Sequence, residues 1–325
     1  MSKWRLTSPL RALMRLAEGV SSRSNRRTPK ILPEKTSSVL DFERIIIAQA
    51  EAFAIKGKQT VALQTLRQLG LDQWGELLWS MPDRNFPGLS SLLPAMSSES
   101  VQNAWTGCSG KALLNQTIPF VRYILSVSSW RPQQIDNLKV LDYGCGYGRI
   151  SRLMMKYVDV ESMFGADPWQ ESIKLVHEAG FGENFKLTDE VPSKLPFEEN
   201  TFDLIWAFSV FTHLSPIVAE KSLETLSKYL SKDGVLVITL RPFEYWDRRT
   251  DINLNTLRKL RESQNSTGIS FYPHNRQEVA EFGFTYGDTT ISLEALGKMA
   301  PQFEILEIER CEVDPYQVYV ALKRI

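Results

Sequence analysis

The pattern of hydrophobic and polar positions changes character near residue 100. Between residues 41 and 70 apolar residues recur at helical spacing in DFERIIIAQAEAFAIKGKQTVALQTLRQLG, where Gly57 predicts a break in the helix. A short amphipathic segment, LDQWGELLWSM, follows, and residues 82–100 are rich in Pro, Ser and Gly, which is typical of a linker or loop. The pattern therefore predicts a helical appendage with its linker over residues 36–100.

Beyond this appendage, short apolar runs alternate with segments of helical spacing, which predicts a parallel α/β sheet. The clearest helix signal covers residues 215–234, where Ser215 is the expected N-cap, Pro216 the first helical residue and Gly234 the end. The predicted strands are LKVLDYG (138–144), SMFGAD (162–167), NFKLTD (184–189), FDLIWAFS (202–209) and GVLVITL (234–240), and the earlier predicted helices cover residues 149–158 and 169–180.

The C-terminal end of the chain has a different pattern. A helical segment over residues 291–300 is followed by two β-rich runs, residues 302–311 and 316–325, which only EVDP connects. A connection that short cannot cross over to a parallel strand, so the two runs must pair as an antiparallel hairpin. The predicted fold class is therefore α/β, with a mostly parallel sheet that ends in an antiparallel hairpin, in a domain over residues 101–325.

Charge is balanced over the whole chain but uneven along it. Lys plus Arg and Asp plus Glu both total 38, so no net field draws the protein to nucleic acid. Residues 1–35, in contrast, hold nine Lys or Arg against Glu18 and Glu34, and apolar residues within 10–17 could share one helical face. Three interpretations of this basic segment stay open: a solvated flexible tail, a helix on an anionic membrane surface, or a transit peptide.

The three cysteines, Cys108, Cys145 and Cys311, are widely spaced and form no CxxC pair. This spacing predicts neither a disulfide framework nor a cysteine-rich zinc site, and it fits a reducing compartment. No apolar run approaches the roughly 20 residues that a membrane-spanning helix needs. We therefore expect a cytoplasmic protein without a bound metal, whose basic N-terminal segment is the part that could contact a membrane surface.

The stretch NLKVLDYGCGYGRISRLM, residues 137–154, predicts a turn against which a ligand lies. An apolar strand leads to Asp142, three glycines follow at alternate positions, and a helical pattern begins. Glycines let a ligand approach the bare backbone, and a helix N-terminus favours an anionic group on that ligand. A dinucleotide site would need a glycine three residues after Gly146, where Arg149 stands instead.

VLDYGCGYGRI resembles the first motif of class I S-adenosylmethionine (SAM)-dependent methyltransferases, and the resemblance extends in order from about residue 100 to the C-terminus. Asp167 ends the second predicted strand, 19 residues after Gly148. LPFEENTFDLIWAFSVFTHL resembles the family's stretch from the third strand through the fourth, DGVLVITLRP its fifth strand, and the terminal hairpin its sixth and seventh. The resemblance implies a Rossmann-like fold with SAM as cofactor, and it implies that the insert over residues 243–290 shapes the acceptor pocket.

The resemblance also implies how SAM would be held. The methionine carboxylate would meet backbone N–H groups of the glycine turn, and Asp142 would hold the amino group. Asp167 would accept the ribose hydroxyls, and Asp189 is a candidate for the adenine amine. A plain turn before Pro168 and a plain loop around Trp105 are the structural alternatives. The implied cofactor-binding residues are Trp105, Asp142, Gly144, Cys145, Gly146, Gly148, Asp167, Pro168, Asp189 and Phe208.

Candidates for catalysis are few, because methyl transfer needs a base only when the acceptor must lose a proton. His213 follows the fourth predicted strand, at the sheet edge where ligands bind in open α/β folds. It could act as a general base, line the pocket, or cap the next helix beside Ser215. His274, in the insert, is the second candidate, and a site without any catalytic residue is the third.

The acceptor is constrained mainly by missing motifs. The D/N-P-P-Y segment of enzymes that methylate exocyclic amines of DNA bases is absent after the fourth strand, where AFSVF stands. The sequence therefore favours a methyltransferase that acts on a hydroxyl or amine of a small molecule or glycan. Two alternatives stay open, a catalytically silent SAM-binding module and a methyltransferase of protein or RNA. Arg149 and the terminal hairpin disfavour a nicotinamide-dependent oxidoreductase. Oligomeric state is not predicted.

Overall fold

The computed structural model describes residues 37–129, 135–274 and 282–325, with side chains from residue 42 onward. The chain divides into two units, Met1–Leu40 and Asp41–Ile325, and the fold described below is that of the second unit. The basic segment predicted over residues 1–35 lies outside the described residues. Within the described ranges, no helix combines the length and apolar character that crossing a membrane requires.

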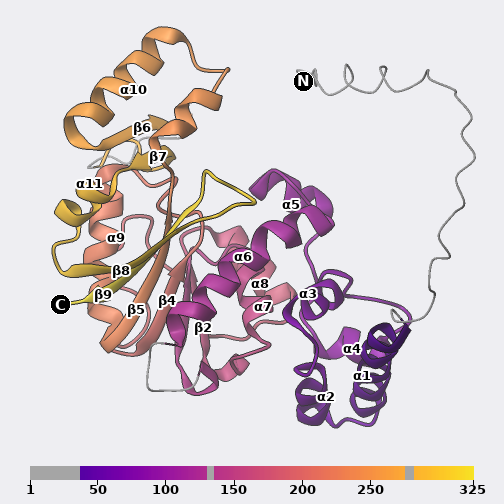
Figure 1. The fold of residues 1–325 in the computed structure, drawn as a ribbon. Helices are drawn as coiled ribbons and strands as arrows, with labels where there is room; N and C mark the ends of the chain where they lie inside the picture. Colours follow the sequence, from indigo (N-terminus) through magenta and orange to yellow (C-terminus); the bar gives the residue numbers. More distant parts are fainter. Residues whose placement is uncertain (1–36, 130–134, 275–281) are drawn as a thin grey trace, which may run out of the picture. The chain divides into compact units, whose positions relative to one another are not determined.

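A seven-stranded sheet forms the centre of the second unit, in the order β3-β2-β1-β4-β5-β9-β8 (Figure 1). The pairs among β1 to β5 are parallel, and β9 runs antiparallel to both β5 and β8. This confirms the predicted mostly parallel sheet with its terminal antiparallel hairpin. The strands are β1 (Val140–Tyr143), β2 (Met163–Asp167), β3 (Phe185–Leu187), β4 (Phe202–Ala207), β5 (Leu230–Leu240), β8 (Phe303–Arg310) and β9 (Val318–Arg324).

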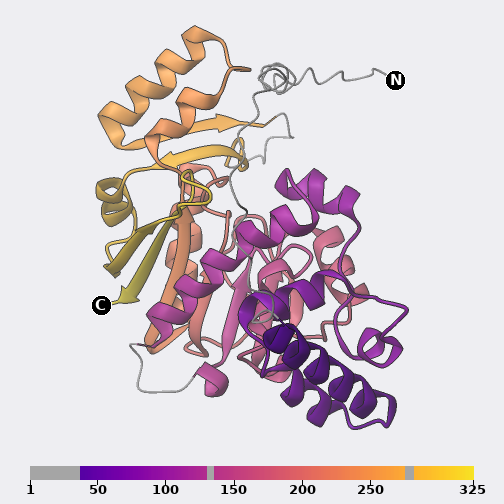
Figure 2. The same ribbon diagram turned by 45° about the vertical axis from the view of Figure 1, so that its right-hand side comes forward.

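Apolar side chains on both faces of the sheet explain why the central strands are almost continuously hydrophobic. Along β5, Val235 and Val237 join the cluster on one face, whereas Leu236 and Ile238 join the cluster on the other. Figures 1 and 2 show helices on both faces. The first face is covered by α6 (Gly110–Ser128), α7 (Arg149–Met154) and α8 (Gln170–Glu178), and the second by α9 (Pro216–Tyr229) and α11 (Leu293–Met299).

The boundary between α9 and β5 differs from the prediction. Ser215 is the N-cap as expected, since its hydroxyl accepts from the Val218 N–H. The helix ends at Tyr229, however, and Leu230 already pairs with Phe202 in the sheet. Leu230 is fully buried in the second-face cluster, so burial of its side chain overrides the glycine signal. Gly234 lies inside β5, where a Cβ atom would come within 3.0 Å of the Phe202 carbonyl oxygen.

The predicted appendage is helical and shares its core with the first face of the sheet. Gly57 separates the first two helices, with a left-handed φ of 71°. Residues 82–100, expected to be irregular, contain one more helix and the start of another. Leu89 and Leu93 of this segment are buried in the same cluster as Trp74, and this burial orders it. The helices are α1 (Ser37–Ile55), α2 (Gln59–Leu66), α3 (Leu71–Trp79), α4 (Pro87–Leu92) and α5 (Glu99–Thr106).

The insert between β5 and α11 has its own secondary structure, which the sequence pattern did not reveal. A 3-10 helix, η4 (Phe243–Arg248), leads to α10 (Leu254–Thr267). A two-stranded antiparallel sheet of β6 (Ile269–Pro273) and β7 (Gly287–Ile291) follows. Because η4 begins directly after β5, the insert stands at the carboxyl end of that strand (Figure 1).

Candidate active site

A cavity of about 590 Å³ opens at the carboxyl ends of β1, β2, β4 and β5. This is the edge at which open α/β sheets bind ligands. Three predicted residues, Gly148, Asp189 and His274, are not among the residues that line it. The predicted residues that line it are Trp105, Asp142, Gly144, Cys145, Gly146, Asp167, Pro168, Phe208 and His213.

The glycine turn after β1 requires glycine for two different reasons. Gly144, Gly146 and Gly148 all have positive φ, at 73°, 54° and 74°, which disfavours residues with a Cβ atom. At Gly144 a Cβ would also lie 2.4 Å from a methyl group of Val210, and at Gly148 it would lie 2.7 Å from the Phe181 ring. Gly148 therefore serves helix packing, whereas the first two glycines line the cavity.

Four N–H groups of this turn, which the sequence led us to expect at the methionine carboxylate, have partners inside the protein. Gly144 and Cys145 both donate to the Ala166 carbonyl oxygen, at 2.7 and 3.2 Å. Gly146 donates to Oδ2 of Asp167 at 2.9 Å, and Gly148 donates to the Cys145 carbonyl oxygen. An anionic ligand group would have to compete with these four bonds or use another partner at this turn.

Arg149 supplies a cation next to the turn. Its guanidinium lies 4.5 Å from the centroid of the Phe208 ring, and Nη1 reaches the Gln116 side-chain oxygen only at 3.5 Å. Arg149 lines the cavity, and within the described part of the chain it has no ion pair with a carboxylate. In the sequence, Arg149 was interpreted only as a departure from the dinucleotide pattern. A cation directly after a glycine turn was the signal that could have indicated a residue of the ligand site.

Asp167 presents its carboxylate to the cavity from the end of β2. It is 6% exposed, and its two oxygens accept from the N–H groups of Gly146 and Trp169, each at 2.9 Å. These bonds fix the carboxylate and leave each oxygen a further lone pair, which suits two neighbouring hydroxyl groups. Burial raises the pKa of Asp167, while the two N–H donors oppose that rise.

Asp142 lies deeper in the cavity wall, at 2% exposure. Its Oδ2 accepts a hydrogen bond of 2.6 Å from the Ser151 hydroxyl. Burial raises the pKa of Asp142 to about 7, because the low-dielectric surroundings disfavour the charged form, although the Ser151 hydroxyl stabilises that form. A cationic ligand group beside Asp142 would compensate the buried charge.

The acidic residue after β3 that faces the cavity is not the predicted one. Asp189 is exposed outside the cavity, whereas its neighbour Glu190 lines it. The Glu190 carboxylate accepts from the hydroxyl of Thr285 in the insert. Thr285 and Tyr286 also line the cavity, so the segment that leads into β7 forms part of its wall.

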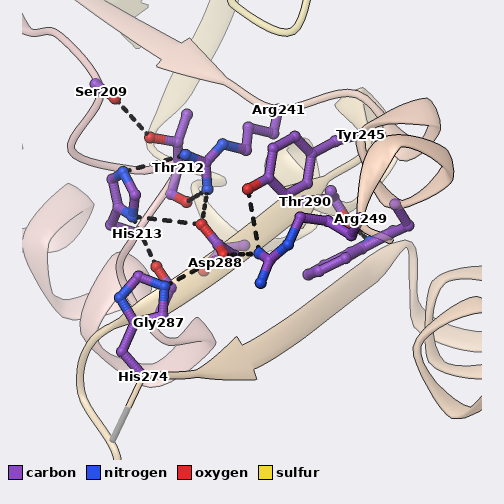
Figure 3. A network of polar contacts seen from close by, with 12 residues as sticks. Ser209, Thr212, His213, Arg241, Tyr245, Arg249, His274, Gly287, Asp288 and Thr290 are labelled. Atoms are coloured by element: carbon purple, nitrogen blue, oxygen red, sulfur yellow. Dashed lines mark hydrogen bonds and ion pairs between the residues drawn. The ribbon is translucent and has the colours of Figure 1, made fainter. Parts of the chain in front are cut away.

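Asp288 on β7 is the centre of a polar network beside the cavity (Figure 3). Its buried carboxylate forms ion pairs with Arg241, which follows β5, and with Arg249, which follows η4. Nε2 of His274 lies 3.2 Å from Oδ2 of Asp288. Burial opposes ionisation of Asp288, but His274 and the two guanidinium groups outweigh it, so the pKa lies below its usual value. The network joins the insert to the carboxyl end of β5.

His213 lines the cavity, but both of its ring nitrogens have partners. Nδ1 donates to the Gly287 carbonyl oxygen at 2.7 Å, which leaves Nε2 to accept from Nη2 of Arg241 at 3.2 Å (Figure 3). The ring stacks on Tyr286 with centroids 5.1 Å apart. Burial, together with the charge of Arg241, lowers the pKa of His213 to about 3. His213 is therefore a neutral, weakly basic side chain in this arrangement.

Comparisons with known proteins fit this geometry. Residues 141–238 match a family described as a methyltransferase domain. The region from β1 through most of β5 therefore belongs to a known catalytic domain family. Residues 141–238 of this chain thus correspond to a methyltransferase domain.

Two curated relatives and one solved structure are similar to the chain. An uncharacterized methyltransferase of Schizosaccharomyces pombe is 29% identical over 126 residues, which cover 33% of this chain and 45% of that protein. An uncharacterized protein of Rickettsia prowazekii is 27% identical over 209 residues, 56% of this chain and 81% of that protein. The crystal structure of a Pyrococcus horikoshii protein gives a TM-score of 0.47 at 16% identity, over 71% of this chain and all of that one.

The residues of the methyltransferase domain fit SAM by their chemistry. SAM carries a carboxylate, an ammonium group and two ribose hydroxyls, and the cavity wall offers one matching partner for each. Arg149, which has no carboxylate partner within the described ranges, suits the carboxylate, and the buried Asp142 suits the ammonium group. Asp167 suits the hydroxyls through its remaining lone pairs. The bare backbone at Gly144 and Gly146 leaves room for the cofactor to lie against the turn.

Proposed function

We propose that this protein transfers a methyl group from SAM to a hydroxyl or amine of a small molecule or a glycan. The observation that carries this proposal is the extent of the cavity. One cavity includes both the SAM-matching residues of β1 and β2 and a second, polar wall beyond them. Its volume of about 590 Å³ falls in the range of small-molecule sites.

The second wall is built from separate elements that converge on the cavity. Ser209 and His213 come from the segment after β4, Arg241 follows β5, and Gln317 precedes β9. Their donors and acceptors suit an acceptor with several polar groups, as small metabolites and sugars have. Tyr286 of the insert, stacked on His213, adds an apolar surface. These side chains can orient an acceptor and exclude water from it.

Bound SAM supplies an electrophilic methyl group on its sulfonium sulfur. The chain holds this cofactor through Asp167, Asp142 and Arg149, and it holds the acceptor through the second wall. A hydroxyl acceptor loses a proton as it is methylated, and an amine that enters as its ammonium form must lose one before it can attack the methyl group. His213 is poorly suited to take that proton. Asp314, whose Oδ2 accepts from the Gln116 amide at 3.0 Å, lines the same cavity and is the carboxylate that we assign to this role.

The proposal is tested with SAM that carries a radioactive methyl group, incubated with the protein and cell extract. Label should appear in material that withstands protease and ribonuclease, and an Asp167→Ala variant should transfer none. Label lost after protease or ribonuclease treatment would instead support a protein or RNA acceptor. Absence of any label, in a protein that binds S-adenosylhomocysteine, would support a silent SAM-binding module and contradict the proposal.

A further inference from the structure

Arg152, on α7, is fully buried although it carries a charge. Its Nη1 donates to the carbonyl oxygens of Tyr147 and Gly148, both at 3.2 Å, and its Nη2 donates to the Ala95 carbonyl oxygen at 2.9 Å. Within the described ranges no carboxylate pairs with it. Burial lowers its pKa to about 10, so the guanidinium stays charged at neutral pH.

The three carbonyl groups belong to two separate segments, the glycine turn and the connector before α5. Tyr147 and Gly148 are part of the glycine turn. Ala95 lies in the connector that leads into α5, and its N–H donates to the Ala179 carbonyl oxygen at 3.0 Å, after the end of α8. Trp105 at the end of α5 lines the cavity, and its ring lies 5.8 Å from that of Tyr147. A single guanidinium thus connects the turn to the segment that carries Trp105.

The helical appendage supports the same helix from outside the cavity. The Trp74 indole N–H on α3 donates to the Arg152 carbonyl oxygen at 3.2 Å. The Arg67 guanidinium, after α2, donates to the carbonyl oxygens of Met155 and Val158 at 3.0 to 3.2 Å. A Cβ atom at Gly75 would lie 2.7 Å from Leu114 on α6 and 3.2 Å from Leu153 on α7. The appendage therefore packs closely against the helix that begins at the glycine turn.

A buried cation without a carboxylate is unfavourable for stability. An apolar side chain of similar length would fill the same space without a desolvation penalty, so packing alone does not explain Arg152. Its donors do explain it, because the planar guanidinium reaches three carbonyl groups at once. Through these hydrogen bonds the Arg152 guanidinium fixes the position of the glycine turn relative to the connector before α5.

We propose that Arg152 is a positioning residue for SAM binding, and that through it α3 and the connector at Ala95 determine cofactor affinity. The proposal rests on the SAM-dependent function proposed above. It assigns a role to the appendage, which supports the cofactor site and is not an independent module.

The test is calorimetric titration of the full chain with S-adenosylhomocysteine, alongside thermal unfolding of each variant. Arg152→Met should raise the Kd about tenfold, the change expected when hydrogen bonds that hold the turn are lost. Arg152→Lys should restore part of the affinity, and Trp74→Phe, which removes only the indole N–H, should weaken binding by a smaller factor. Arg122→Gln is the matched control, because Arg122 on α6 pairs with Asp72 on α3 at 2.6 Å through side chains that are 59% and 53% exposed.

The outcomes separate this inference from the proposed function. A wild-type protein that does not bind S-adenosylhomocysteine contradicts the proposed function itself. A wild type that binds, with folded Arg152→Met and Trp74→Phe variants that bind equally well, overturns the positioning role and leaves the function intact. If Arg152→Met does not fold, Arg152→Lys and Trp74→Phe decide in the same way. A lower melting temperature with an unchanged Kd would show a merely structural role and contradict the proposal.

Discussion

The carboxyl group of Asp142 has a pKa of about 7 because it is buried in the cavity wall. An acid with a raised pKa is neutral below that value and becomes anionic above it. The partner that we assign to it is the ammonium group of SAM, which requires the anion. Affinity for S-adenosylhomocysteine, which carries the same group, should therefore rise between pH 6 and 8. Titrations across this range should show no such rise in affinity for the Asp142→Asn variant. A variant whose affinity rises with pH as much as that of the wild type would contradict the assignment.

The imidazole of His213 is predicted to stay neutral through the physiological range. Its pKa of about 3 lies below the usual value near 6.5, so protonation occurs only in acid. Nuclear magnetic resonance of the ring nitrogens should show a single neutral tautomer, protonated at Nδ1, from pH 5 to 8. A resonance that titrates near pH 6.5 and disappears in His213→Asn would contradict this and restore His213 as a candidate base.

At the residue scale, the sequence predicted the residues that line the cavity at β1 and β2 better than those of the second wall. Asp142 and Asp167 lie near the carboxyl ends of β1 and β2, and Gly144 directly follows β1. A motif with fixed spacing identifies such positions. Arg241 and Asp288 were missed because they meet through tertiary contacts between the end of β5 and β7, far apart in the sequence. No local pattern indicates which of the acidic residues in an insert will be buried between two arginines.

At the scale of elements, the β6–β7 hairpin is held to the rest of the domain by the Asp288 network. Asp288→Asn would leave two arginines, with side chains 11% and 17% exposed, without their shared carboxylate. Removing one partner of a buried ion pair is destabilising, and we expect a loss of about 3 kcal/mol. Asp251→Asn is the matched control, since Asp251 also pairs with Arg249 but is 67% exposed, and it should cost less than about 1 kcal/mol.

Urea unfolding of the two variants measures this difference directly. Equal midpoints for Asp288→Asn and Asp251→Asn would show that the network contributes little to stability. A shift confined to Asp288→Asn would show that the buried carboxylate holds the hairpin in place.

The strands and helices of the sheet were predictable because short apolar runs alternate with segments of helical spacing from residue 138 onward. Prediction failed where tertiary burial outweighed local signals. Leu230 leaves α9 to enter β5, against the glycine signal at Gly234. Residues 82–100 looked like a linker, yet α4 begins there at Pro87, and the Glu51 carboxylate accepts from the N–H groups of Gly88 and Leu89. A helix capped by a residue so distant in the sequence leaves no local signature.

At the scale of the molecule, the appendage and the methyltransferase domain share one hydrophobic cluster. Trp74 and Leu78 of α3 belong to the same buried cluster as Val140 and Trp206 of the sheet. We therefore expect residues 41–325 to unfold in one cooperative thermal transition. Differential scanning calorimetry measures this, and two separate transitions for these residues would contradict a shared core.

Calorimetric titration with SAM and S-adenosylhomocysteine, wild type beside Asp167→Ala, tests the central claim most directly. Asp167 is the carboxylate that the backbone N–H groups of Gly146 and Trp169 fix in the cavity wall. The account predicts that the wild type binds both compounds and that the variant, still folded, binds neither measurably. A wild type that binds neither compound, or a folded variant that binds both as tightly as the wild type, would contradict it.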